Sequence, residues 1–482
     1  MATTFADFWP HLVAIAAIVF PGLATVHILL TKQDAREAAS WTTIVWLVPY
    51  LGILFYLVLG ISRLRRRAIR LRPPVGLRRD PRAGSAAAAK QPPALPDHAH
   101  HLGDLAGLAN AVTHLPLAPG NRLMPLVGGD AAFPQMLAAI DSAERTVGLA
   151  TYIFDDDPTG RQFVDALDRA ARRGVQVRVL IDAVGARYSM RNMGSRLQRQ
   201  GVTAAEFLPS MFPWHMSYLN LRNHRKIMVV DGMVGFTGGM NIRAGHRLET
   251  QPRHPVQDIH FRVEGPVVRH MSATFVDDWA FVTGEMLDGD GWAAEPQTTG
   301  TAMARGLPSG PDDAFDRLVW VLLGALSVAR RSVQIVTPYF IPDQRLITAL
   351  QVAALRGVSV DVVLPAVGNL RLVQWAATAQ LWQMLHQGVR VWLTPPPFDH
   401  TKLMVVDGHW SMVGSANWDP RSLHLNFEFC VEVYDRGFAD TLQAIVRDKI
   451  GRATPCTLAD VSGRGLPVKV RDGLAWLLSP YL

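Results

Sequence analysis

The sequence predicts an α/β protein of two similar units around a pseudo-twofold axis, preceded by an N-terminal two-helix transmembrane hairpin. Two long runs near the N-terminus lack charged residues, and several blocks of residues recur later in the same order. Strand-like and helix-like patterns alternate within each copy. Hydrophobic residues make up 49% of the 482 residues and charged residues 18%, which excludes a largely disordered chain.

The net charge of +7 points to a polyanionic partner, either nucleic acid or the head groups of anionic lipids. The only two cysteines, Cys430 and Cys456, lack the spacing of a disulfide framework or a zinc site. We therefore expect a reducing compartment.

Residues 8–31 and 41–60 contain no Asp, Glu, Lys or Arg, and each run can cross a bilayer as a helix. The first run lacks the basic start of a signal peptide, and the second follows closely, so we interpret residues 1–62 as a hairpin. The alternative is a pair of buried helices in a soluble domain.

An arginine-rich segment directly follows the second run, between Arg63 and Arg82. The loop 32–40 has two basic and two acidic residues, so the positive-inside rule places both the N-terminus and residues 61 onward in the cytoplasm. The segment 63–118 is rich in Pro, Arg and Ala, and we expect a basic tether. It holds His98, His100 and His101, which we interpret as solvated and not as metal ligands.

Three blocks then occur twice in the same order, at 143–154 and 329–340, 170–182 and 353–365, and 224–241 and 400–417. Such repetition indicates an internal duplication. The predicted organisation is a first unit over 119–290, a linker over 291–312 and a second unit over 313–482.

Each copy opens with a strand, a helix and a second strand. In the first copy these are VGLATYIF, then RQFVDALDRAARRG ending at Gly174, then VQVRVLID. Alternation of this kind favours a layered fold with a parallel or mixed sheet. Two such units would share a site at their junction.

The densest motif begins at His224 and continues with Lys226, Asp231, Gly239 and Asn241. The second copy repeats these offsets with His400, Lys402, Asp407, Ser415 and Asn417. In a strand, residues i and i+2 face the same side, so each histidine projects together with its lysine. The aspartate after the apolar run can then hold an imidazole or a lysine, and the small residue allows close backbone approach.

Placed face to face, the two copies give two imidazoles, two ammonium groups and two amides. This set suits an anion with acid–base demands, because lysine and asparagine can hold phosphoryl oxygens. One imidazole can attack phosphorus while the other protonates the leaving alkoxide. The lysines supply the positive charge, so we expect neither a metal nor another cofactor.

These residues resemble the phospholipase D superfamily, whose HxKxxxxD signature occurs in two copies, and more closely the bacterial cardiolipin synthases. The segments that carry the resemblance are 35–60, 257–268, 275–279, 337–343, 417–428 and 474–482. The resemblance implies two phospholipase D-like α/β/α units that share one active site.

The resemblance also implies roles for individual residues. His224 would be the nucleophile that forms a phosphohistidine, and His400 the general acid and then the general base. Phosphate would be bound by Lys226, Lys402, Asn241 and Asn417. Supporting residues would be Asp231, Asp407, Gly239, Ser415, Glu428 behind His224, and Asp258 behind His400. Members of the family often carry a tyrosine shortly before each motif; here Tyr218 and Phe398 stand near those places.

The implied reaction joins two phosphatidylglycerol molecules into cardiolipin and releases glycerol, at the bacterial inner membrane with the catalytic part in the cytoplasm. The implied partners are phospholipid substrates and the bilayer, not nucleic acid. Two apolar segments could form a rim that excludes water, at 207–219 and at Trp476–Leu478, although packing between the halves would explain them equally well.

Other functions remain open from the sequence. They are a phospholipase D that hydrolyses its substrate, a synthase of another phospholipid, a membrane-bound nuclease and a non-catalytic scaffold. A nuclease gains nothing from a membrane hairpin, and a scaffold has no need of two intact motifs. The sequence does not decide the oligomeric state.

Overall fold

The computed structural model describes residues 2–32, 34–60, 95, 97–188, 193–208, 221–311 and 316–479. The chain forms two compact units, Met1–Arg67 and Ala68–Leu482. Both copies of the duplicated sequence lie in the second unit.

The described residues of the first unit are almost all helical. It consists of α1 (Ala2–Thr31), α2 (Ala35–Leu47), α3 (Pro49–Phe55) and the π-helical turn η1 (Tyr56–Gly60). Within the described part of the chain, one stretch, Phe8–Thr31, passes as long and apolar enough to cross a membrane. The second run is not one continuous helix, because Pro49 has no backbone N–H to donate and α2 ends before it.

The helices of the first unit pack through a small apolar cluster of Ile28, Val45 and Tyr56. Gly52 allows α3 to approach α2, since a Cβ at this position would lie 2.4 Å from the carbonyl oxygen of Ile44. The arginine-rich segment after this unit lies outside the described residues.

The predicted tether is wrong in its last part. The chain forms η3 (Asp97–Leu102) and α5 (Gly103–Thr113), which pack against α10 (Arg317–Val328). Leu102, Leu105 and Ala109 are fully buried there, because their spacing places them on one helical face.

Most strands of the second unit form one 16-stranded sheet, and two short strands, β8 (Val256–Gln257) and β14 (Phe398–Asp399), form a separate pair. Its first half runs in the order β1-β9-β7-β6-β2-β3-β4. The strands of this half are β1 (Ala118–Val127), β2 (Thr146–Thr151), β3 (Gln176–Asp182), β4 (Thr203–Phe207), β6 (Ile227–Val230), β7 (Val234–Gly238) and β9 (Ile259–Glu264). Strands β2, β3 and β4 are parallel to one another, and the other neighbouring strands of this half pair antiparallel.

The second half repeats this order as β10-β17-β16-β15-β11-β12-β13 and adds β18 at its edge. Its strands are β10 (Ala302–Ser309), β11 (Ser332–Val336), β12 (Ser359–Pro365), β13 (Arg390–Thr394), β15 (Leu403–Val406), β16 (Trp410–Gly414), β17 (Asn426–Tyr434) and β18 (Thr454–Cys456). Antiparallel pairing of β1 with β10 joins the halves. The predicted linker 291–312 therefore contains a central strand, which its mixed sequence without alternation did not indicate.

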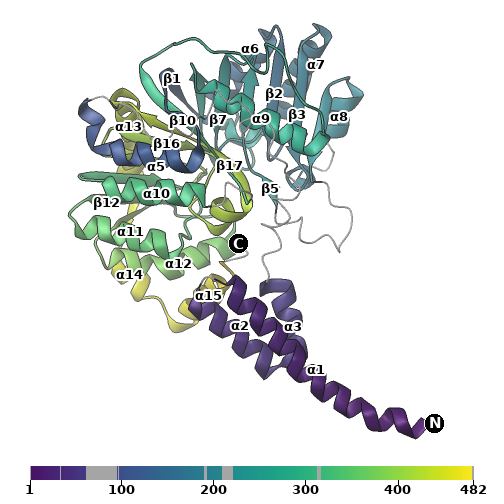
Figure 1. Ribbon diagram of the computed structural model, residues 1–482. Coiled ribbons are helices and arrows are strands. Elements are labelled where there is room, and N and C mark those ends of the chain that lie inside the picture. Colours follow the sequence, from purple (N-terminus) through teal and green to yellow (C-terminus); the bar gives the residue numbers. More distant parts are fainter. Residues whose placement is uncertain are drawn as a thin grey trace. The chain divides into compact units, whose positions relative to one another are not determined.

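Helices cover both faces of this sheet (Figure 1). One face is covered by α6 (Gly128–Asp141), α7 (Pro158–Arg172) and α8 (Met193–Arg199) in the first half, and by α5, α10, α11 (Gln344–Leu355) and α12 (Arg371–Leu385) in the second. The other face is covered by α9 (Val268–Thr283) in the first half and by α13 (Arg436–Arg452) in the second. The helices α14 (Leu458–Ser462) and α15 (Leu466–Leu477) end the chain, and α15 packs on α12.

The structure thus bears out a mixed α/β fold with duplicated topology. The strand–helix–strand start predicted for the first copy is present as β2, α7 and β3. Gly174 follows α7 with a φ of 90°, a backbone conformation that glycine adopts without a steric penalty.

Candidate active site

Each motif histidine is held at the junction by a short strand that pairs with the opposite half. Strand β5 (Arg222–Asn223) runs parallel to the start of β17, and the backbone N–H of His224 donates to Phe427 O at 2.9 Å. Strand β14 (Phe398–Asp399) pairs in the same way with β8 (Val256–Gln257), and the N–H of His400 donates to Gln257 O at 2.7 Å. The backbone of each half therefore positions the histidine of the other.

A carboxylate from the opposite half holds each imidazole. Nδ1 of His224 lies 2.9 Å from Oε1 of Glu428, and Nδ1 of His400 lies 2.8 Å from Oδ2 of Asp258. Because a carboxylate accepts the Nδ1 proton, Nε2 of each ring is left as the reactive atom. The structure brings these four predicted residues together as two crossed pairs.

The two small residues of the motif lie beside these carboxylates. Ser415 Oγ donates to Glu428 Oε2 at 2.5 Å, and Asn426 Nδ2 donates to Oε1 at 3.2 Å. Gly239 holds the place of Ser415 in the first copy, where a Cβ would lie 2.4 Å from Asp258 Oδ1. Hence the hydroxyl of Ser415 supports the carboxylate of Glu428, while Gly239 leaves room for the carboxylate of Asp258.

The two lysines are buried beside the histidines. Lys226 Nζ donates to the backbone oxygen of His224 at 2.8 Å, and Lys402 Nζ donates to that of His400. Only 2% of Lys226 and 4% of Lys402 is exposed. Each ammonium group thus lies beside the histidine of its own motif, in agreement with the proximity that the i, i+2 spacing predicts.

Burial and mutual repulsion shift the pKa values of this cluster. Burial, and then the lysine charges, hold the pKa of both His224 and His400 well below the ordinary value. Burial lowers the pKa of Lys226 to about 7 and that of Lys402 to about 8. An anion bound between these groups would favour their protonated forms and raise all four pKa values.

The carboxylates shift in the opposite direction. Burial raises the pKa of Glu428 to about 7, although the charge of Lys226 opposes the shift. Burial likewise raises the pKa of Asp258, against the charge of Lys402. The pKa values of Lys226, Lys402 and Glu428 thus lie near neutrality, where these groups can gain or lose protons when a ligand binds.

The two asparagines lie at equivalent places but are engaged differently. Asn241 Oδ1 accepts from the N–H of Ile153 at 3.1 Å. Asn417 Nδ2 donates to Ser422 Oγ at 3.2 Å, and its amide also bonds to Asp419. The amide nitrogen of Asn241 is therefore the better placed of the two to donate to a ligand.

Comparison with known proteins agrees with this geometry. A family model described as the phospholipase D-like domain of cardiolipin synthase matches residues 136–251 and 322–449. A cardiolipin synthase of Geobacillus kaustophilus is 30% identical over 465 residues, covering 94% of this chain and 91% of the relative. A cardiolipin synthase A of Pseudomonas aeruginosa is 33% identical over 471 residues, covering 95% and 94%.

The chain belongs to the cardiolipin synthase family of phospholipase D-like proteins. A second model, described as a phospholipase D-nuclease N-terminal region, matches residues 19–60. The crystal structure of a phosphatidylserine synthase from Haemophilus influenzae has the same fold, with a TM-score of 0.60 and 14% identity, covering 79% of this chain and all of that one.

The aspartates of the family signature do not reach the imidazoles or lysines, contrary to our expectation. Asp231 accepts hydrogen bonds from the backbone N–H groups of Glu144, Arg145 and Thr146, at 2.7 to 3.0 Å. It follows β6, and five residues of extended chain separate it from Lys226 by roughly 16 Å. Asp231 therefore holds the backbone of residues 144–146 in place, at the end of β6 that lies away from Lys226.

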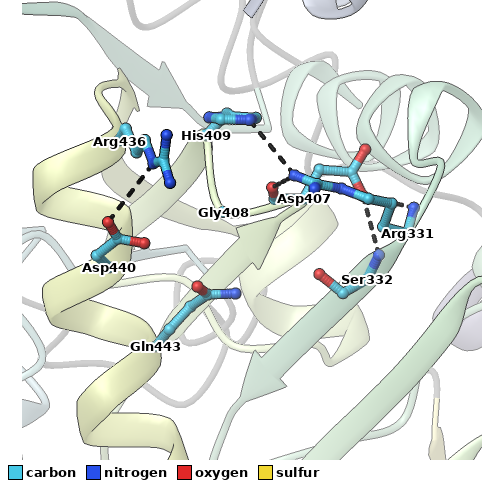
Figure 2. A pocket seen from close by; sticks show the side chains of 8 residues that line it. All are labelled: Arg331, Ser332, Asp407, Gly408, His409, Arg436, Asp440 and Gln443. Carbon is cyan, nitrogen blue, oxygen red and sulfur yellow. Dashed lines mark hydrogen bonds and ion pairs between the residues drawn. The ribbon is translucent and has the colours of Figure 1, made fainter. Parts of the chain in front are cut away.

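In the second copy, Asp407 accepts hydrogen bonds from the backbone N–H groups of Arg330, Arg331 and Ser332. Its side chain also bonds to Nε2 of His101. Asp407 lines a cavity of about 370 Å³, and neither His400 nor Lys402 is among the lining residues. Figure 2 shows the side chains around it. No residue of the crossed pairs lines this cavity. His101, interpreted from the sequence as solvated, is a partner of Asp407.

Sequence reasoning missed several neighbours of the site. The ring of Tyr152 packs edge-on against His224 with centroids 5.1 Å apart, and Tyr339 packs in the same way on His400 at 6.1 Å. Both follow the first parallel strand of their copy, where α/β sheets place their ligands. Their position at the end of this strand could have indicated a role in the site. The repeats did not reveal it, because the two tyrosines do not align between them.

Asp182 and Arg225 were also missed. Asp182 is fully buried, accepts from the N–H of Asn223 at 2.9 Å, and has a pKa raised by burial to about 6. Arg225 is 1% exposed and donates to the backbone oxygen of Glu428 at 3.0 Å. Neither residue recurs in the second copy, where Pro365 and Thr401 stand in their places, so the duplication could not indicate them.

One prediction falls outside what the structure describes. The apolar segment before the first motif, with Tyr218, lies almost wholly in the undescribed residues 209–220.

Among the described residues, no group of three or more His, Cys, Asp or Glu could hold a metal ion. Phe398, which stands where a tyrosine was expected, packs on His400 with ring centroids 5.9 Å apart.

Proposed function

We propose that this protein synthesises cardiolipin by transferring a phosphatidyl group from one phosphatidylglycerol to another. The observation that carries the proposal is the pair of imidazoles, each oriented by a carboxylate of the opposite half and each beside a buried lysine. We assign the first catalytic half to residues 118–290, from β1 onward, and the second to the residues from Ala302 onward, beginning with β10. Membership in a family whose relatives are named cardiolipin synthases supports the choice of substrate.

In the first step Nε2 of His224 attacks the phosphorus of the donor lipid. The P–N bond forms as the P–O bond to the glycerol head group breaks, and Nε2 of protonated His400 gives its proton to the leaving oxygen. Glu428 stabilises the positive charge that develops on His224, because its carboxylate accepts the hydrogen bond from Nδ1. Glycerol leaves and a phosphatidyl-histidine remains.

In the second step the roles reverse. Nε2 of His400, now neutral, accepts the proton of a terminal hydroxyl of a second phosphatidylglycerol. The hydroxyl oxygen attacks phosphorus, the P–N bond breaks, and the product is cardiolipin. One phosphodiester replaces another, so the exchange needs no external energy source.

The phosphoryl oxygens are held by Lys226 and Lys402, with amide donors from Asn241 and Asn417. Burial makes these contacts strong, because little water competes for the charge. It also keeps the lysine pKa values near neutrality until the anion arrives, so substrate binding itself charges the site.

We also propose that the first unit crosses the inner membrane twice and leaves the catalytic unit in the cytoplasm. Support comes from the uncharged run 41–60, whose helices pack on α1, and from the arginines that follow it. Alkaline phosphatase fused after Arg36 should be active, and fused after Arg72 inactive. The opposite pattern would refute this topology.

Product analysis tests the reaction. The full-length protein, reconstituted in vesicles with phosphatidylglycerol labelled in its head group, should release one glycerol for each cardiolipin formed. His224→Ala and His400→Ala serve as controls for contaminating activity. Phosphatidic acid as the main product would instead identify a hydrolase, and no turnover without a further lipid would identify another phosphatidyltransferase.

A further inference from the structure

The last helix, α15, carries an apolar face that no described residue covers. Leu466, Val470, Leu474 and Leu477 follow one another at helical spacing and are between 52% and 73% exposed. The opposite side of the helix buries Asp472 and Ala475. This side packs on α12, so the apolar face points away from the catalytic unit.

Helix α12 and the turn before it extend this face. Leu372 and Trp382 lie on the outer side of α12, and Val367 and Leu370 precede it; all four are between 46% and 59% exposed. The two helices lie against one another (Figure 1). We call the eight residues the α12–α15 surface: Val367, Leu370, Leu372, Trp382, Leu466, Val470, Leu474 and Leu477.

The exposed charges on these two helices are all positive. Helix α12 contains no Asp or Glu, and the single carboxylate of α15, Asp472, is 1% exposed and paired with Arg464 and Arg471. Arg371, Lys469 and Arg471 are exposed around the apolar face. An apolar face edged by cations matches the interface of an anionic bilayer, where leucines enter the acyl region and the cations meet head groups.

The same surface is connected to the catalytic site. Behind it, Val373, Ala376 and Ala475 form a buried cluster on which Tyr339 packs. The hydroxyl of Tyr339 donates to Asn369 Oδ1 at 2.9 Å, in the turn between Val367 and Leu370, and its ring packs on His400. A bilayer in contact with this turn would bring lipid head groups toward the imidazole.

We propose that the α12–α15 surface docks on the anionic bilayer and orients the catalytic site toward its lipid substrates. The docking goes beyond the proposed reaction and would hold for any lipid-directed chemistry at this site. The apolar span in the same chain favours a bilayer over a second copy of the protein or its own N-terminal unit as the occupant.

Depth measurements on the full-length protein test the docking without using its activity. An environment-sensitive fluorophore is attached to Val470→Cys or Leu474→Cys, in a Cys456→Ser background, since Cys430 is only 1% exposed and will not react. Leu355→Cys on α11 is the matched control, because Leu355 is 69% exposed on another helix.

In vesicles of phosphatidylcholine and phosphatidylglycerol, the labels at 470 and 474 should shift to the blue and be quenched by lipids with spin labels in their acyl chains. The label at 355 should do neither, and the effect should weaken without phosphatidylglycerol. Unquenched labels at 470 and 474 would overturn the proposal. So would shielding that persists in detergent or grows with protein concentration, because these outcomes identify the N-terminal unit or a second copy as the occupant.

Activity gives a second readout. The ratio of turnover on vesicles to turnover on dispersed short-chain lipid should fall by about tenfold or more in Val470→Glu/Leu474→Glu, since acidic residues oppose insertion into an anionic interface. Val352→Glu/Leu355→Glu on α11 should keep the wild-type ratio. Equal ratios in both pairs would refute docking, whereas absence of cardiolipin from either lipid form would refute only the proposed reaction.

Discussion

Nδ1 of His224 lies 2.9 Å from Oε1 of Glu428, although 204 positions of sequence separate the two residues. The mirrored contact joins His400 to Asp258 over 142 positions. Both contacts cross the junction between β1 and β10, so the acid–base chemistry depends on the relative placement of the halves. The predictions below follow from these contacts.

Replacing either carboxylate should impair catalysis more than folding. Glu428→Gln and Asp258→Asn keep the shape of the side chain but remove the negative charge that stabilises an imidazolium. We expect turnover to fall by about 10²–10⁴-fold, the range of general acid–base catalysis, with a small change in melting temperature. Vesicle assays and thermal unfolding check this. Near-wild-type turnover in both variants would contradict the crossed pairs.

The two histidines should differ in their response to the leaving group. His224→Ala should abolish the phosphohistidine and all transfer. His400→Ala should still form it when the donor lipid carries a nitrophenyl head group, because this leaving group needs no proton. Mass spectrometry of the intact protein after acid-free quenching detects the adduct. An adduct in His224→Ala would assign the nucleophile to the other half.

Binding of a phosphodiester should take up protons. The pKa values of Lys226 and Lys402 are lowered to about 7 and about 8 in the free site, and a bound anion raises them, so affinity should weaken as pH rises from 7 to 9. The loss reaches about tenfold per pH unit for each proton taken up. Titration calorimetry with glycerophosphoglycerol, in buffers of different ionisation heat, counts the protons. Lys226→Met should reduce the count, and pH-independent affinity would contradict the prediction.

Asp407→Asn should lower stability and leave the chemistry largely intact. Burial raises the pKa of Asp407, but three backbone amides and His101 lower it further, so the folded pKa lies below the ordinary value of 3.8. The carboxylate therefore stabilises the fold above pH 3.8, and this stability is lost as pH falls through the folded pKa. We expect the free energy of unfolding at pH 7 to drop by about 1–3 kcal/mol. Denaturant unfolding at pH 7 and pH 3 measures the difference, which should shrink at the lower pH.

Gly239→Ala should be more harmful than its size suggests. The added Cβ would lie 2.4 Å from Asp258 Oδ1, so the carboxylate must move away from His400. Turnover should fall toward that of Asp258→Asn. Ser415→Ala is the matched variant in the other copy: it removes one hydrogen bond from Glu428 and adds no clash, so its loss should be smaller. A greater loss in Ser415→Ala would reverse the assignment.

Local patterns predicted the parts of the site that depend on local geometry. The i, i+2 spacing placed Lys226 with His224 because side chains alternate along a strand. The repeated blocks predicted the duplicated topology because each block fills the same place in its half. The crossed carboxylates, in contrast, came from the family resemblance, since no local pattern links residues so far apart in sequence.

The errors share a physical cause. Asp231 and Asp407 are close in sequence to the lysines but lie beyond a whole strand, so a shared motif did not mean a shared site. Helix α5 and strand β10 looked like linkers because their stability comes from contacts with distant elements. Val48 ends α2 because the next residue is a proline, which hydropathy alone does not register.

The crossed carboxylates also have a genetic consequence. If the proposed roles hold, a substitution at Glu428 in the second repeat should disable the imidazole of the first, and a substitution at Asp258 should disable the imidazole of the second. Mutations should therefore group by crossed pair and not by repeat, and neither repeat could drift, be lost or be exchanged between paralogues without a matching change in its neighbour.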